Sequence, residues 1–380
     1  MQNYAEGNNV FSRFGLTVKQ TRIMFSIERL LVKEDISIEK DAVKKRLKLQ
    51  WLNEWEKSIK DGLIALGLEV LSPNASVFLD RTQIINEIKK VNISSPENNT
   101  WYYLVMLEAT LFIPYTPFNV NTNDKSELKE QIKAYKDLKY KRQTAFLEKL
   151  TEENHIMDKI YIKQFEKTYK NAISNAKGTK KKMWIITASI AVATALSFGI
   201  GSIFASSIAT ALVGSNFVGL SGAALANASL AFIGGGAIAA GGAGMAGGAA
   251  IIAGGAALLG GAVAGGAGGA VLAFSSSPEF TLSQAAKLEV VLREIILNAQ
   301  KDVKFAQEVM KNMKSQIQEL TQKLSELELE DKENKDVIKN LKKSIDYLTK
   351  VFKENNRFVS SFEEGTKATE NTVKQLKAGE

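Results

Sequence analysis

The spacing of hydrophobic residues predicts that residues 1–182 form a mainly helical soluble domain. Apolar side chains recur at intervals of three and four in Thr17–Lys33, and the same period continues in Val43–Leu71 until a turn-forming Ser-Pro pair. The most apolar part of this section, Trp101–Phe118, contains prolines near its end and is either a buried helix or a pair of strands. In either form we expect it to be a core element.

Charged residues return in a helical pattern from Lys125 to Asn175. One face of this predicted helix is apolar and carries Tyr161, Phe165, Tyr169 and Ile173. Lysines recur every three or four residues in the same segment, so its last part is predicted to have a basic stripe: Lys159, Lys163, Lys167 and Lys170.

Residues 279–380 carry the heptad pattern of a coiled coil. Apolar residues fill eleven consecutive a and d positions at alternating steps of four and three. The polar run Glu328–Asp336 interrupts the pattern, which resumes from Ile338 to Phe352. We therefore predict two long helices folded into an antiparallel coiled-coil hairpin, with self-pairing and dimerisation both open. The first series comprises Leu292, Ile296, Ala299, Val303, Ala306, Met310, Met313, Ile317, Leu320, Leu324 and Leu327.

Between these two sections, residues 183–278 carry no charge. These 96 residues contain no Asp, Glu, Lys, Arg or His, and they hold 21 of the 28 glycines of the chain. A lysine cluster and Trp184 come at the start, as in a membrane helix, because lysines stay with lipid headgroups and an indole ring prefers the interface. Since a span takes about 20 residues, we predict a membrane region of two or four helices.

The glycine-rich stretch Gly234–Ala270 has other interpretations. Gly242–Gly247 matches the G-x-G-x-x-G of a dinucleotide-binding loop, but the acid expected about 20 residues later is missing until Glu279. A P-loop needs a lysine after its glycines, and none follows them here. A flexible linker uses Ser and charged residues to stay in water, whereas the spacers here are Ala, Ile, Leu, Val and Met. The pattern favours a membrane-seeking segment.

Glycines four residues apart let membrane helices approach until their backbones touch. Because Gly and Ala add little transfer free energy, the segment Gly234–Phe274 is only marginally apolar. We therefore hypothesise that it is packed away in one state and inserted in another. The predicted helix-packing positions are Gly244, Gly248, Gly261, Gly265 and Gly269.

Basic charge is concentrated just before the uncharged tract. Residues 1–182 carry 31 Lys and Arg against 23 acids, while residues 279–380 carry 18 of each. This surplus favours an anionic bilayer as partner and places both ends on the cytoplasmic side of the cell membrane. The predicted membrane-interface residues are Lys163, Lys167, Lys170, Lys177, Lys180, Lys181, Lys182 and Trp184.

Catalytic and metal-binding patterns are missing from the sequence. The chain has no cysteine, and its one histidine, His155, lies among Glu152, Glu153 and Asp158 in a segment that suits a solvated helix. We expect no enzymatic activity, no cofactor and no metal, and without a recognised binding module we expect no nucleic acid. The first residues lack a secretory signal, so we expect the protein in the cytoplasm before it inserts.

The order of these parts resembles that of the α-helical pore-forming toxins of the haemolytic enterotoxin and cytolysin class. Trp184–Phe274 corresponds to their apolar head, and Leu292–Leu327 to part of their tail bundle. The Gly/Ala tract between helices is also similar to the membrane-addressing region of apolipoprotein-L-like proteins. The chain departs from the toxins in lacking a secretion signal and in its longer apolar segment. Both resemblances imply permeabilisation or remodelling of a membrane.

The sequence therefore predicts an all-α protein: a helical bundle with a Gly/Ala-rich hydrophobic membrane region and a long C-terminal coiled-coil hairpin. We expect it to form a homo-oligomer that permeabilises or perturbs a bilayer, as an intracellular toxin or anti-phage defence effector. The alternative is a non-lytic membrane-anchored scaffold that presents its coiled coil to a protein partner.

Overall fold

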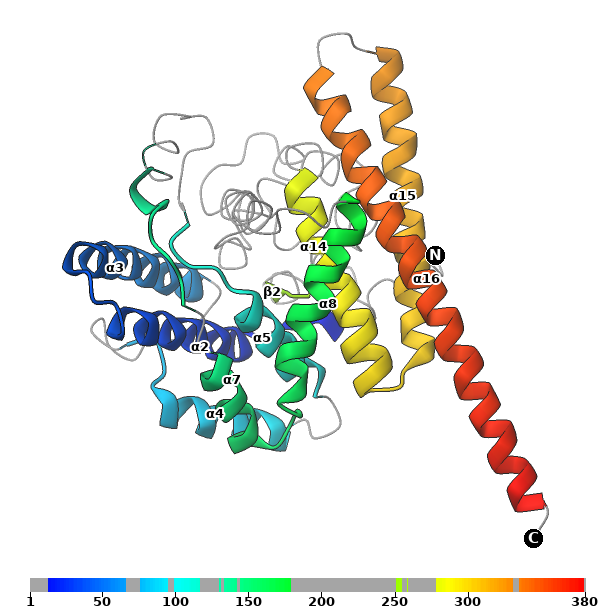
Figure 1. Ribbon diagram of the computed structural model, residues 1–380, viewed down its shortest axis with the longest axis horizontal. Coiled ribbons are helices and arrows are strands. Elements are labelled where there is room, and N and C mark those ends of the chain that lie inside the picture. The colour runs from blue at the N-terminus through cyan, green and yellow to red at the C-terminus, as the bar shows by residue number, and fades with distance from the viewer. Residues whose placement is uncertain are drawn as a thin grey trace, which may run out of the picture.

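The computed structural model describes residues 13–65, 76–94, 99–116, 130, 133–141, 144–178, 251–254, 258, 278–330 and 335–378. These residues are mostly helical, as predicted (Figure 1). The one sheet within these ranges has two short strands, β1 (Gly15–Leu16) and β2 (Ile251–Ile252). None of the helices described has both the length and the apolar composition needed to cross a bilayer.

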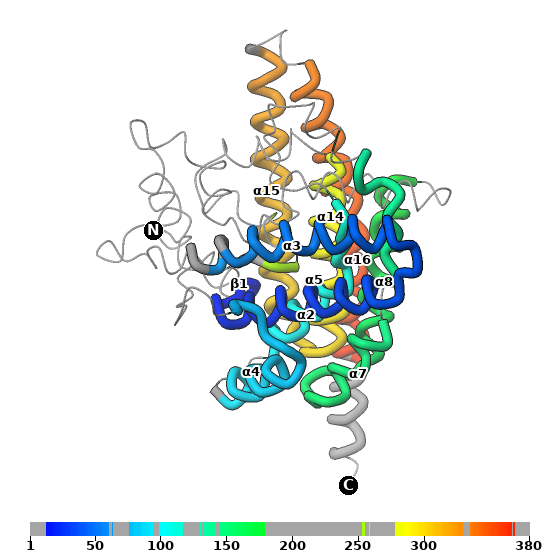
Figure 2. Tube along the Cα trace, turned by 90° about the vertical axis from the view of Figure 1, so that its left-hand side faces the viewer, coloured from blue at the N-terminus to red at the C-terminus, as the bar shows by residue number. Residues whose placement is uncertain are grey.

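The first two helices pack side by side at one edge of the molecule (Figures 1 and 2). α2 (Val18–Ser37) begins at Thr17, where a capping box joins the side chains and backbones of Thr17 and Gln20. α3 (Ala42–Ala65) carries the buried Trp55, which contacts Phe25 of α2 edge-on with ring centroids 6.1 Å apart. Both predicted helices are confirmed within the described ranges, and α2 continues four residues beyond Lys33.

The apolar segment that starts at Trp101 is a helix and not a pair of strands. α5 (Thr100–Leu111) lies between α2 and α8, and its side chains are therefore buried on almost all sides, including Leu104 and Leu107. The helix ends just before Pro114, because a proline disfavours helical backbone in the residue that precedes it. α4 (Arg81–Ser94) packs against the other side of α2.

The charged segment predicted as helix from Lys125 to Asn175 is not helical at residues 136–141 and is broken again at His155. α7 (Thr144–Asn154) ends there, since His155 has a left-handed φ of 54°, and α8 (Ile160–Lys177) begins five residues later. The prediction that His155 lies within a helix is therefore wrong, although its side chain is exposed as expected. The apolar face of α8 is confirmed, with Phe165 and Ile173 buried in the core.

The C-terminal section contains three successive helical arms. α14 (Pro278–Val290) continues into the π-helix η4 (Val291–Ala299), a turn follows at residues 300–302, and α15 (Val303–Glu330) then reverses direction (Figure 1). The prediction of one unbroken helix from Leu292 to Leu327 is wrong. Its first members, Leu292 and Ile296, belong to η4, because the chain turns at Lys301 with a φ of 57°.

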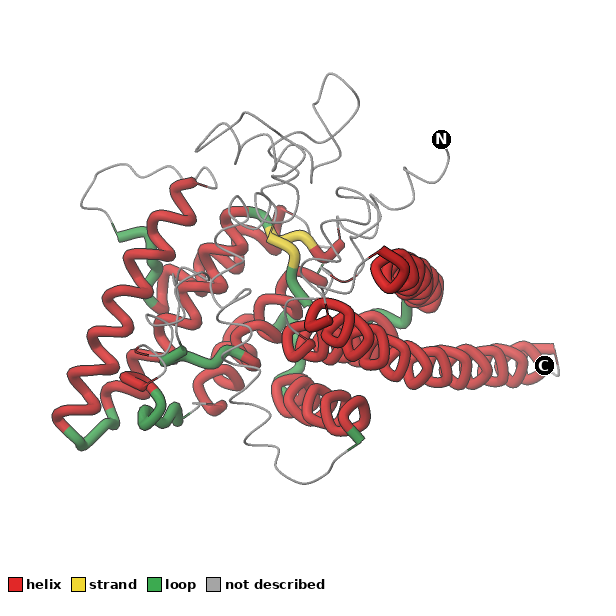
Figure 3. Tube along the Cα trace, turned by 90° about the horizontal axis from the view of Figure 1, so that it is seen from above, coloured by secondary structure: helices red, strands yellow, loops and turns green. Residues whose placement is uncertain are grey.

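α16 (Lys335–Ala378) returns along α15 and continues beyond it (Figures 1 and 3). Most predicted heptad positions face the resulting interfaces. Leu292, Ile296, Met310, Met313 and Leu320 are buried, and Val303, Ile317, Leu324 and Leu327 are half-buried against the core.

One hydrophobic core joins the two ends of the chain. α14 packs against both α8 and α16, and a continuous set of buried side chains runs from Phe25 of α2 through Leu104 and Phe165 to Leu348 of α16. The helices that precede and follow the uncharged tract in sequence are therefore neighbours in space.

Candidate functional site: the docking site of the apolar tract

Residues 251–254 and 258 of the uncharged tract are described, and they lie against the helical body. β2 pairs with β1 in antiparallel register, with Gly15 opposite Ile252. The next residue, Ala253, donates its N–H to the carbonyl of Phe14 at 3.1 Å. Ala253 and Leu258 are 3% and 1% exposed. Backbone pairing with β1 allows this part of the tract to be buried without orphaned polar groups.

Gly254 is the tightest contact of this docking site. Its φ of 67° is left-handed, and a Cβ added to it would lie 2.6 Å from Cγ2 of Val291 and 2.8 Å from Cδ2 of Leu104. Side chains rarely adopt this backbone conformation, and no real Cβ tolerates such distances. Glycine is therefore needed here for close approach to α5 and η4.

A buried ion pair accepts a hydrogen bond from the backbone N–H of Gly254. Glu108 of α5 accepts the Gly254 N–H at Oε1 over 2.9 Å, and its Oε2 accepts a hydrogen bond from Nζ of Lys287 on α14. Both side chains are only 17% exposed. The tract is thus attached to the charged pair that also links α5 to α14.

Glu28 of α2 completes this charged cluster. Burial, and then the charge of Glu108, raise the pKa of Glu28 well above its usual range, and Lys287 opposes this shift only in part. Burial disfavours the ammonium of Lys287, but the charge of Glu108 and its hydrogen bond outweigh burial, so the pKa of Lys287 is raised. A protonated Glu28 leaves one negative and one positive charge in the cluster, which is therefore neutral.

The segment before β1 connects the docking site to the turn between η4 and α15. Arg13 donates to Oδ2 of Asp302 at 2.7 Å and to Oε1 of Gln300 at 3.2 Å. The Arg13 guanidinium also lies 3.7 Å from the ring centroid of Phe305. Residues 13–16 thus hold the tract on one side and this turn on the other.

The predicted basic face of α8 is present but partly neutralised. Lys163 and Lys167 are exposed, and Lys163 pairs with Glu148 of α7 at 3.0 Å. Lys170 pairs with Glu166 one turn earlier in α8. Lys177 is half-buried, and burial lowers its pKa. The remaining predicted interface residues, Lys180, Lys181, Lys182 and Trp184, lie outside the described residues, as do Gly244, Gly248, Gly261, Gly265 and Gly269.

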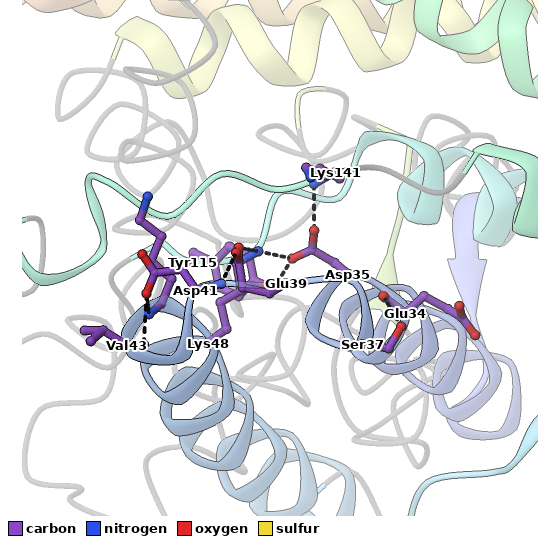
Figure 4. Close-up of polar contacts among 10 residues, drawn as sticks. Glu34, Asp35, Ser37, Glu39, Asp41, Val43, Lys48, Tyr115 and Lys141 are labelled. Atoms are coloured by element: carbon purple, nitrogen blue, oxygen red, sulfur yellow. Dashed lines mark hydrogen bonds and ion pairs between the residues drawn. The ribbon is translucent and has the colours of Figure 1, made fainter.

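A second polar cluster lies at the corner between α2 and α3 (Figure 4). Asp35 is 0% exposed and Lys48 is 1% exposed, and their side chains are 2.7 Å apart. Asp35 also accepts hydrogen bonds from the Tyr115 hydroxyl and the Lys141 backbone N–H. Lys48 also forms an ion pair with Glu39. The hydrogen bond from Lys48 is the main cause that lowers the pKa of Glu39 to about 2.

This corner cluster has the arrangement of a structural ion pair that links α2 to α3. Its two central charges are paired and closed to solvent, so no substrate reaches them in this state. Burial is the first cause that raises the pKa of Tyr115, followed by its hydrogen bond to Asp35. Sequence analysis missed the cluster, although one signal was available: Asp35 shares the apolar face of α2 with Leu31 and Val32.

Metal-binding geometry does not occur among the residues that the structure describes, where no three His, Cys, Asp or Glu side chains converge. In comparisons with known proteins, no protein family, curated protein or solved structure matches this chain.

Proposed function

We propose that this protein inserts into a bilayer from the cytoplasmic side, oligomerises through its glycine faces and permeabilises or perturbs the membrane. Its role would be that of an intracellular toxin or anti-phage defence effector. In this proposal residues 183–278 supply two or four membrane helices, and α15 and α16 form the antiparallel coiled-coil hairpin of the soluble scaffold. Anionic lipid is the partner expected for the lysines that precede the tract.

The docking of residues 251–254 is the observation that carries the proposal. A segment of 96 residues without charge is costly to keep in water, and Ala253, Gly254 and Leu258 of this segment are buried. The close approach of Gly254 and the backbone pairing of β2 with β1 hold this part against the helical body. Such contacts would keep a membrane-seeking tract soluble before it meets a bilayer. In lipid the same backbone would satisfy its hydrogen bonds by forming helices.

Release of a trapped dye from anionic vesicles tests the proposal directly. We expect full-length protein to release the dye and Gly265→Leu to release little, because a leucine side chain separates helices that must touch at glycine. Gly265→Ala is the matched control, since it adds one methyl group and keeps a small residue at the contact. Equal release by both variants would show that close helix packing at Gly265 is not needed.

The projecting end of α16 favours a second candidate function, a non-lytic membrane-anchored scaffold. This helix continues past the rest of the molecule and offers an extended arm to a protein partner (Figure 1). Vesicle binding without dye release would support the scaffold and contradict permeabilisation.

A further inference from the structure

We infer that the turn at residues 300–302 is a conformational joint, at which η4 and α15 merge into one continuous helix when the tract leaves β1. This inference deepens the proposed function and rests on it for the event that opens the joint. It assigns the regulation of the docking site to Arg13, Lys301 and Asp302.

The sequence pattern of a helix continues across the turn. The heptad series continues without a change of step from Ile296 on η4 through Ala299 to Val303 on α15. From Glu279 to Glu330 the chain has neither Gly nor Pro, the residues that usually end helices. The local sequence is therefore compatible with one helix from α14 to the end of α15.

The backbone of the turn is irregular. Lys301 has a left-handed φ of 57°, a conformation that is unfavourable for a residue with a Cβ. The nine residues before Gln300 form the π-helix η4, a conformation that is rare and frequently occurs at functional sites. The Gln300 N–H donates to the Ile295 carbonyl at 3.0 Å, and the Asp302 N–H donates to that of Ile296 at 2.9 Å. The bent form therefore keeps irregular backbone that a straight helix would lack.

One local cap and several contacts from distant parts of the chain hold the bend in place. Locally, Asp302 caps α15 by accepting the Phe305 N–H at 3.0 Å. The other contacts come from distant parts of the chain: Arg13 binds Asp302 and Gln300, and Thr100 accepts a hydrogen bond from Gln300 at 2.6 Å. Tertiary contacts thus stabilise a turn for which the sequence supplies no Gly or Pro.

The docking site and the bend share one short segment. Phe14 accepts a hydrogen bond from Ala253 of the tract, while Arg13, its neighbour, holds the bend. Phe14 also contacts Phe305 of α15, with ring centroids 5.9 Å apart. Loss of the tract removes the β1–β2 pairing that orders this segment and so weakens the Arg13 contacts. By linkage, a straightened joint in turn weakens docking of the tract.

Fluorescence energy transfer in the full-length protein measures the state of the joint. Dyes are attached to cysteines that replace Asn175, exposed at the end of α8, and Ser325, exposed near the end of α15. In the bent form Ser325 lies near the start of α14, because ion pairs link Glu279 to Lys343 and Lys342 to Glu328. Asn175 also lies near it, because the charge of Lys177, two residues further along α8, interacts with that of Glu279. In one continuous helix Ser325 would lie about 70 Å from Pro278 along the axis, so transfer would fall. The natural chain has no cysteine that would compete for label.

Two substitutions of Lys301 bias the joint in opposite directions. Lys301→Gly favours the left-handed bend and disfavours a helix, whereas Lys301→Ala does the reverse, and both remove the same side chain. We expect the ratio of straight to bent protein to differ by about 30-fold between them. Arg13→Ala is expected to increase the low-transfer population in water without lipid, and Arg46→Ala, at an exposed position of α3, serves as its control.

The outcomes separate the joint from the proposed function. Low transfer in Arg13→Ala and a higher low-transfer fraction in Lys301→Ala than in Lys301→Gly support the joint, even if no variant releases dye from vesicles. Unchanged transfer in all variants, in water and on vesicles, overturns the joint, even if the protein permeabilises them. Circular dichroism of each variant identifies loss of transfer that is caused by unfolding.

Discussion

At the scale of single residues, Gly254 is the most constrained position of the docking site. Gly254→Ala forces a methyl group to within 2.6 Å of Val291 and strains a left-handed backbone. We expect it to lower the free energy of unfolding by about 1–3 kcal/mol, as measured by denaturant titration, and to speed dye release because the docked state is weakened.

Gly365→Ala is the matched control for this substitution. Gly365 lies in α16 with no heavy atom within 4 Å of an added Cβ, so alanine meets open space and favours the helix. The free energy of unfolding of this variant is expected to equal that of the wild type or to exceed it by up to about 1 kcal/mol. An equal loss of stability in both variants would contradict the role assigned to close packing at Gly254.

The buried carboxyl of Glu28 predicts a dependence of stability on pH. Its pKa in the folded protein is raised well above the ordinary value of 4.5, so the folded protein binds more protons at this group than the unfolded chain does. The free energy of unfolding therefore falls as pH rises above about 4.5. Glu28→Gln removes this loss of stability at higher pH. The unfolding midpoint of the variant is therefore expected to exceed that of the wild type at neutral pH and to vary less between about pH 4 and pH 8.

Glu39→Gln is the control of opposite sign. The pKa of Glu39 is lowered to about 2, chiefly by the hydrogen bond from Lys48, so its contribution to stability is present above about 4.5 and is lost as pH falls toward 2. The variant is expected to be less stable than the wild type at neutral pH and to approach it in acid. Parallel pH profiles for wild type and Glu28→Gln would contradict the raised pKa of Glu28.

At the scale of elements, α8 joins the core to the predicted membrane surface. Replacing Lys163, Lys167 and Lys170 by Gln is expected to weaken binding to anionic vesicles by about 10-fold. The loss of affinity is smaller than for three unpaired lysines, because two of these lysines are paired with acids. Sedimentation with vesicles at low salt measures this, and the effect is expected to shrink as salt is raised.

The control for α8 changes the same net charge elsewhere. Lys133, Lys136 and Lys139 are all exposed and lie outside α8, so their replacement by Gln is expected to weaken vesicle binding much less. Equal weakening by both triple variants would show that net charge, and not the face of α8, controls binding.

The regular elements were the predictable part of the fold. α2, α3 and the apolar face of α8 follow from apolar residues at helical spacing, since burial on one side of a helix requires that period. The bend after η4 was not predicted, because apolar spacing alone does not detect a turn that lacks Gly and Pro. Asp302, which caps α15, was the available signal.

The candidate site was less predictable than the helices. The sequence showed that the tract has a special composition, but pairing of β2 with β1 joins residues far apart in the chain, such as Gly15 and Ile252, which are 237 positions apart. Nothing local in either strand specifies that partner. The buried cluster around Glu108 likewise depends on packing of α2, α5 and α14 against one another. The spacing of apolar residues within one helix does not reveal such tertiary contacts.

At the scale of the whole molecule, the uncharged tract lies in sequence between two sections that share one core. α8 and α14, which flank the tract in sequence, pack against each other, so both ends of the tract start from the same side of the body. The tract can therefore leave the docking site without separating these helices. Among the contacts that the structure describes, its release breaks the pairing of β1 with β2 and the contact of Gly254 with Glu108.

A disulfide across β1 and β2 tests whether this release is required. Gly15 and Ile252 are directly opposed in the antiparallel pair, where Cα atoms lie about 4.5–5.5 Å apart, within the range for a disulfide. In Gly15→Cys/Ile252→Cys, which has no other cysteine, we expect the oxidised protein to release no dye from anionic vesicles and a reductant to restore release. Dye release by the single variant Gly15→Cys should be the same with and without reductant. Full release by the oxidised double variant would mean that the tract acts without leaving β1, and that the docking site does not hold the protein inactive.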